Sequence, residues 1–164
     1  PLWRRLISQL PEWTLDVVGD GPEIDEIRAS IAAESLPRIE VHGRQPSKPF
    51  FERSALYVMT SVFEGFPNTL VEAQSQGSVP IVFDSYPMVR SLISDGQDGR
   101  LVPTNDLDAL ANAVRHLCES SEDRIRMAKG ALASASRFTE NEVAKQWDAL
   151  LRDLVEQSAL GENG

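Results

Sequence analysis

Residues 55–77 read ALYVMTSVFEGFPNTLVEAQSQG, and they predict a buried strand, a loop and the start of a helix. The apolar run 55–59 is typical of a strand that is buried on both faces. Asn68 and Thr69 can cap a helix, and the apolar residues after them begin its buried face. The first backbone N–H groups of a helix are free, and the helix dipole is positive at that end. The loop before residue 68 is therefore predicted to bind an anion such as a diphosphate.

Strand and helix patterns alternate on both sides of this segment. Further strands are expected at 14–19, 39–43, 79–83 and 99–102, and helices at 23–34, 49–54, 68–76 and 87–94. Such alternation predicts an α/β fold, a Rossmann-like parallel sheet with helices on both faces and right-handed crossovers.

The pattern changes after Pro103, where strands are no longer indicated. Helices are expected at 106–119, 121–136 and 140–157, with Asp106 capping the first. A chain of 164 residues is long enough to bury one core. We therefore expect one domain over residues 1–157 and a disordered tail over 158–164.

Composition excludes several classes of protein. The net charge of -9 argues against a nucleic-acid partner, which requires clustered Lys and Arg. No apolar run approaches the roughly 20 residues that span a bilayer, and no signal peptide is visible at the start of the sequence. The single cysteine, Cys118, excludes an internal disulfide. Together these features favour a cytoplasmic location.

The stretch 61–82 reads SVFEGFPNTLVEAQSQGSVPIV and resembles the E-x7-E region of retaining GT-B glycosyltransferases, specifically glycosyltransferase family 4. Glu64 and Glu72 match the two carboxylates, and their setting in S-x-x-E-G-F-P-N-x-L-x-E-A makes the match specific. The resemblance implies the C-terminal, donor-binding half of a GT-B enzyme. Such an enzyme would move a hexose or N-acetylhexosamine from an NDP-sugar, expected to be a UDP-sugar, to a glycan or lipid-linked acceptor in polysaccharide biosynthesis.

The resemblance also assigns roles around the loop. Glu72 is expected to accept hydrogen bonds from both ribose hydroxyls, and Glu64, the expected catalytic residue, to contact the transferred sugar. The backbone expected to surround the sugar and phosphates belongs to Gly65, Phe66, Pro67, Asn68, Thr69 and Leu70. Because Pro67 has no N–H, the amides of residues 68–70 are the expected diphosphate donors. Family precedent favours front-face substitution over a covalent intermediate on Glu64.

Two further loops leave expected strand ends. Gly19 and Gly21 are similar to the family's G-x-G-P turn, which lines the nucleotide site. His42, Gly43 and Arg44 are expected to lie against the base. His42 has a second interpretation, as a structural residue that closes a buried strand.

The sequence also departs from the family pattern. Family members carry a phosphate-binding Arg and Lys just before the point that matches Pro1, and an acceptor-binding N-terminal domain before those. This part alone is therefore expected to be inactive. No metal site and no cofactor are expected, since cationic side chains and a helix terminus stabilise the leaving phosphate in such enzymes. Two alternatives stay open: a non-hydrolysing sugar-nucleotide epimerase, and a non-catalytic nucleotide-binding domain.

Overall fold

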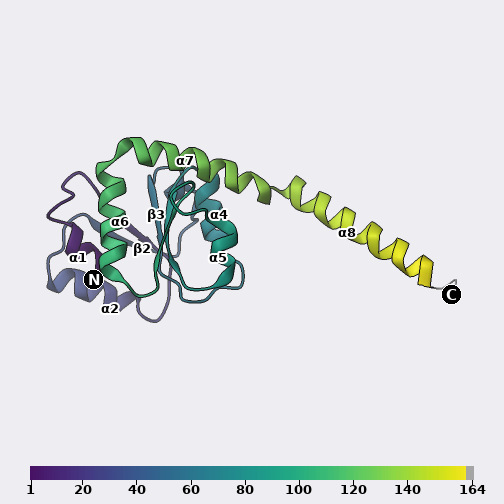
Figure 1. Ribbon diagram of the computed structural model, residues 1–164. Helices are drawn as coiled ribbons and strands as arrows, with labels where there is room; N and C mark the ends of the chain where they lie inside the picture. The colour runs from purple at the N-terminus through teal and green to yellow at the C-terminus, as the bar shows by residue number, and fades with distance from the viewer. Residues whose placement is uncertain (162–164) are drawn as a thin grey trace.

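The computed structural model describes the backbone of residues 1–161 and the side chains of residues 1–157 (Figure 1). The strands are β1 (Leu15–Val18), β2 (Ile39–Gly43), β3 (Leu56–Met59), β4 (Val79–Asp84) and β5 (Arg100–Pro103). The helices are α1 (Leu2–Leu6), α2 (Ile24–Ala33), α3 (Lys48–Phe51), α4 (Asn68–Ser75), α5 (Pro87–Leu92), α6 (Leu107–Glu119), α7 (Ser121–Ala135) and α8 (Glu140–Gly161), with a 3-10 helix, η1 (Ser136–Phe138), before α8. The expected α/β alternation is confirmed, and β2 has the expected bounds.

Strand β4 is the centre of a three-stranded parallel sheet with the order β3-β4-β5. Alternate residues of a strand point to opposite faces. Val79, Ile81 and Phe83 accordingly pack with α1 and α6, whereas Val82 packs with α4 and α5. Because both edges are paired and both faces are covered, residues 79–83 are all buried. The domain thus has helices on both faces of its sheet, as expected.

Strands β1 and β2 form a separate parallel pair. Within the described residues, β1 pairs only with β2, and β3 pairs only with β4. The side chains of β1 are all half-buried, although three of the four are apolar. The sheet is therefore parallel throughout but divided, and β1 and β3 each keep one edge without a backbone partner in this part of the chain.

Helix α4 begins at Asn68, and its N-cap residue is Pro67, which makes no side-chain capping bond. The expectation that Asn68 and Thr69 cap this helix is therefore wrong, because both residues already lie inside the first turn. Packing fixes the helix instead, since Leu70 and Ala73 are fully buried. The helix ends at Ser75, and Gly77 follows with a positive φ of 79°. This turn lets the N–H groups of Gly77 and Ser78 donate to the carbonyls of Gln74 and Ala73 at 3.0 and 3.1 Å.

The helices after β5 follow the expected pattern. Asp106 caps α6 as predicted, because its Oδ1 accepts from the backbone N–H groups of Asp108 and Ala109 at 3.1 and 2.8 Å. Helix α8 leads away from the body and ends past the expected residue 157 (Figure 1). Residues 162–164, the rest of the segment expected to be disordered, lie outside the described residues. None of the helices in residues 1–161 combines the length and apolar character that crossing a bilayer requires.

Candidate donor-binding site

The loop 61–67 joins the end of β3 to the start of α4. Its backbone is anchored where Ser85 Oγ donates to the carbonyl of Ser61 at 2.8 Å. Its other end is anchored by the buried Pro67 and by Phe66. The ring centroids of Phe66 and Phe138 lie 5.7 Å apart in an edge-to-face arrangement. The loop is therefore attached to β4 on one side and to η1 on the other, and its tip is left exposed at Val62 and Phe63 (57% and 78%).

Among the amides expected to surround the sugar and phosphates, those of Gly65, Phe66 and Thr69 make no hydrogen bond within residues 1–161. The amides of Asn68 and Leu70, in contrast, donate to the carbonyls of Phe66 and Pro67 at 2.9 and 3.0 Å. Free N–H groups at a helix N-terminus bind anions. Of the three amides expected to bind a diphosphate, only that of Thr69 is free in this structure.

Glu64 is half-buried and makes no hydrogen bond or ion pair within the described residues. Together with burial, its negative charge nevertheless raises the pKa of two tyrosines, Tyr57 and Tyr86. Burial raises the pKa of Tyr57, the hydrogen bond to Thr69 opposes this rise, and the charges of Glu64 and Glu72 add to it. Burial also raises the pKa of Tyr86, and the charge of Glu64 raises it further. Both carboxylates thus lie around Tyr57, and Glu64 alone acts on both phenols.

Glu72 lies farther along α4, and its side chain reaches across to α3. Ser47 Oγ donates to Glu72 Oε2 at 2.9 Å. The two residues line a groove of about 450 Å³ between the start of α3 and the middle of α4, together with Pro46, Lys48, Phe51, Ser75 and Gln76. This volume is within the range of small-molecule sites, roughly 300–1,000 Å³. No sequence pattern indicated Ser47, because its contact depends on how two helices approach.

The two other expected loops meet at the ends of β1 and β2. The backbone N–H of Gly19 donates to the carbonyl of Gly43 at 2.9 Å. Gly43 is buried and has a φ of 70°, which explains glycine there. Gly21 and Arg44 are exposed at the same end of the domain, where the carboxyl ends of the parallel strands meet.

His42 is held by neighbours from two elements. Its Nε2 lies 2.6 Å from Asp16 Oδ1, and its ring lies 4.7 Å from that of Phe50. Arg53 donates to Asp16 Oδ2 at 2.9 Å. Burial alone would raise the pKa of Asp16, but the hydrogen bonds from His42 and Arg53 lower it below its usual range. These contacts fit the structural interpretation of His42, and a role against the base stays a prediction.

The same contacts bring together Asp16, Glu40 and His42, whose potential metal-ligating atoms lie within 4.8 Å of one another. The expectation of no metal site overlooked this cluster, although Glu40 and His42 are two positions apart on β2 and so share a face. Because Arg53 already supplies a positive charge to Asp16, we interpret the cluster as a structural charge network.

The arginines of α1 are engaged elsewhere. Arg4 pairs with Glu34, and Arg5 pairs with Asp108. They therefore do not replace the phosphate-binding cations of the family pattern.

Comparisons with known proteins identify relatives of this chain. The chain is 32% identical over 156 residues to an exopolysaccharide phosphotransferase, SCO2592, of Streptomyces coelicolor, covering 92% of this chain and 16% of that protein. It is 29% identical over 160 residues to the UDP-N-acetylglucosamine--peptide N-acetylglucosaminyltransferase GtfA subunit of Streptococcus gordonii, covering 93% of this chain and 32% of that protein. The chain thus spans less than a third of each relative.

The fold matches a solved transferase closely. The pneumococcal O-GlcNAc transferase GtfA, crystallised with UDP and GlcNAc, superposes with a TM-score of 0.83 at 25% identity, over 94% of this chain and 32% of that one. Residues 2–133 match the family Glycosyl transferases group 1, a region that includes the groove, the loop 61–67 and both carboxylates. The chain therefore belongs to the Glycosyl transferases group 1 family and has the fold of GT-B glycosyltransferases.

Proposed function

We propose that this domain binds the nucleotide-sugar donor as the C-terminal half of a retaining, family 4 glycosyltransferase. One observation carries the proposal. Glu72 lies beside a groove on α4, while free amides and Glu64 lie at the N-terminal end of the same helix. A nucleotide sugar is an extended ligand with a diol, a diphosphate and a sugar in that order. The site offers an acceptor, donors and a second acceptor in the same order.

Each part of the ligand is proposed to hydrogen-bond to a group of this domain with matching donors or acceptors. The ribose hydroxyls donate to Glu72, which as a carboxylate only accepts. The diphosphate lies at the free amides of Gly65, Phe66 and Thr69, where the dipole of α4 favours negative charge. Hydroxyls of the transferred sugar donate to Glu64. Since the related GtfA was crystallised with UDP, we propose a UDP-sugar as the donor.

The proposed reaction is a front-face substitution. The acceptor hydroxyl oxygen attacks the anomeric carbon from the face on which the diphosphate leaves, so the configuration is retained. The bond between the anomeric carbon and the phosphate oxygen breaks with its electron pair on the diphosphate, and a phosphate oxygen takes the hydroxyl proton. The free amides and the helix dipole stabilise the charge that develops on the leaving group. The proposal includes no metal or cofactor.

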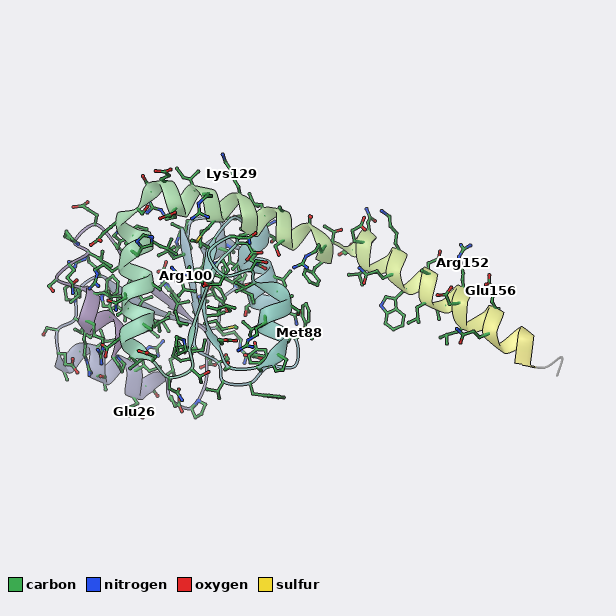
Figure 2. All side chains as sticks on the ribbon, viewed as in Figure 1. Glu26, Met88, Arg100, Lys129, Arg152 and Glu156 are labelled. Carbon is green, nitrogen blue, oxygen red and sulfur yellow. The ribbon has the colours of Figure 1, made fainter. Side chains whose placement is uncertain are left out.

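We propose that the acceptor-binding domain and the phosphate-binding cations belong to the rest of a longer chain. Two surfaces support this. One edge of β1 and one edge of β3 lack backbone partners in residues 1–161. Helix α8 exposes a stripe of apolar side chains at Val143, Trp147, Leu150 and Leu151. Figure 2 shows that Arg152 and Glu156, both on α8, stand clear of the body.

A second candidate function is a donor-binding module in a protein with a different overall activity. The relative from Streptomyces coelicolor favours it, because that protein is named a phosphotransferase and is mostly outside the matched region. In that case the domain binds a nucleotide, but the intact protein transfers no sugar. Assaying the intact protein with UDP-sugars separates the two candidates, since only the first predicts glycoside formation.

Saturation-transfer NMR with UDP, GDP and ADP tests the proposed donor. We expect signals for UDP and weak binding, with a free energy of about -5 kcal/mol, because few contacts remain without the second half of the cleft. We also expect no transfer of sugar by this domain alone, since the acceptor is not positioned. Absence of UDP binding would contradict the proposal, and so would turnover by the isolated domain.

A further inference from the structure

The hydroxyl of Ser47 does not cap the helix that Ser47 precedes. This serine is the N-cap residue of α3, where a serine side chain ordinarily accepts from the backbone N–H groups of its own first turn. Here it makes no capping bond. Its Oγ instead donates to Glu72 Oε2 at 2.9 Å, across 25 positions of sequence. The hydroxyl therefore serves a contact between two helices.

This contact constrains a carboxylate that otherwise has freedom. Glu72 is exposed, and a glutamate side chain on a helix surface samples several rotamers. The hydrogen bond from Ser47 to Oε2 holds the carboxylate at the wall of the groove. Each carboxylate oxygen accepts more than one hydrogen bond, so Oε1 and the remaining lone pair of Oε2 stay available.

We propose that Ser47 is a positioning residue of the ribose site, which holds the Glu72 carboxylate in the orientation that accepts the two ribose hydroxyls. The inference rests on the proposed function of Glu72. Fixing a binding group before the ligand arrives reduces the entropy that is lost on binding. Ser47 thus contributes to recognition of the ribose through Glu72.

The structure supplies a matched control. Ser75 lines the same groove, and its Oγ donates to the backbone carbonyl of Glu72 at 2.7 Å, not to the carboxylate. Replacing Ser47 or Ser75 by alanine removes one groove hydroxyl in each case. Only the first substitution releases the carboxylate.

The test is titration calorimetry of the protein with UDP and with 2′-deoxy-UDP. Ser47→Ala should weaken UDP binding by about three- to tenfold, the effect of one modest hydrogen bond. Binding of 2′-deoxy-UDP should change less, so the preference for ribose falls. Ser75→Ala should keep this preference, and Ser47→Thr, which retains the hydroxyl, should restore it. In a Glu72→Ala background, Ser47→Ala should have no further effect, because residues that act through one contact are not additive.

The outcomes separate this inference from the proposed function. If Glu72→Ala loses the preference for ribose and a folded Ser47→Ala keeps it, Ser47 only ties α3 to α4, and the inference is overturned while the function stands. If Ser47→Ala weakens both nucleotides equally, its role is structural and the inference is likewise overturned. If wild-type protein shows no preference for UDP over 2′-deoxy-UDP, both the inference and the ribose role of Glu72 are overturned.

Discussion

Glu64 and Glu72 lie on one short stretch of sequence, but their surroundings differ. Glu72 belongs to a helix fixed by the buried Leu70 and Ala73, and Ser47 holds its carboxylate. Glu64 belongs to a loop with an exposed tip, and no side chain among the described residues bonds to it. The carboxylate of Glu72 therefore already has a partner within this domain, and that of Glu64 has none among the described residues. We propose that the sugar end of the site acquires its contacts only with the ligand and the rest of a longer protein.

The largest effect is expected from Glu64→Gln in the intact transferase. The substitution keeps the shape of the side chain and removes its charge. If the contact with the sugar strengthens as positive charge develops at the anomeric carbon, kcat/KM should fall. The fall should correspond to a loss of about 2–4 kcal/mol of transition-state stabilisation. Steady-state kinetics with a UDP-sugar measures this. An unchanged kcat/KM would contradict the proposal that Glu64 contacts the transferred sugar.

Glu72→Ala should weaken binding of uridine and UDP alike, because both contain the ribose. A hydrogen bond to a charged group contributes about 1.5–3 kcal/mol, which corresponds to roughly 10- to 150-fold in affinity. Calorimetry with both ligands checks the size and the equality of the two losses. Unchanged UDP affinity in a folded variant would leave Glu72 as a surface carboxylate near the helix N-terminus.

The two tyrosines should report the positions of the carboxylates separately. Glu64→Gln should lower the pKa of both Tyr57 and Tyr86, whereas Glu72→Gln should lower that of Tyr57 alone. NMR titration of ¹³Cζ-labelled tyrosine resolves the two phenols. Since folding raises the pKa of Tyr57 from 10.0, the protein should also lose stability as the pH rises through the folded-state value. Identical responses to the two substitutions would contradict the arrangement.

The smallest effect is expected from Asn68→Ala. Because Asn68 makes no capping bond and packing holds α4, the free energy of unfolding should change by less than about 0.5 kcal/mol. A loss near the 1 kcal/mol typical of a removed cap would show that the helix start needs this side chain. Urea denaturation monitored by circular dichroism measures the difference.

Much of the fold could be predicted because the relevant signals are local. The apolar runs of β3 and β4 mark strands, and Asp106 marks a helix start by its own chemistry. Only β4 is buried as the apolar runs predict; β3 is half-buried except at Met59, because one of its edges has no backbone partner among the described residues. The loop 61–67 and its two carboxylates are found the same way, since their residue types and spacing are visible in the sequence. Pro67 is the exception, because it takes the N-cap place that Asn68 was expected to fill.

Two of the missed features depend on contacts between distant residues. Ser47 reaches Glu72 only because α3 lies against α4, and Asp16 meets His42 only through the register of β1 on β2. The packing of distant segments decides both contacts, and periodicity carries no information about it. The free amides were missed for a local reason, because the turn at 66–70 uses the N–H groups of Asn68 and Leu70 internally.

The most direct test of the proposed division between the carboxylates is titration calorimetry of UDP and UDP-N-acetylglucosamine with wild type, Glu64→Gln and Glu72→Ala. Glu72→Ala should lose affinity for both ligands. Glu64→Gln should bind UDP as wild type does and lose affinity only for the UDP-sugar, because in the proposed site Glu64 contacts the sugar and Glu72 the ribose. Equal loss of both ligands in Glu64→Gln, with the fold intact by circular dichroism, would contradict the assignment of the sugar to Glu64 and the ribose to Glu72.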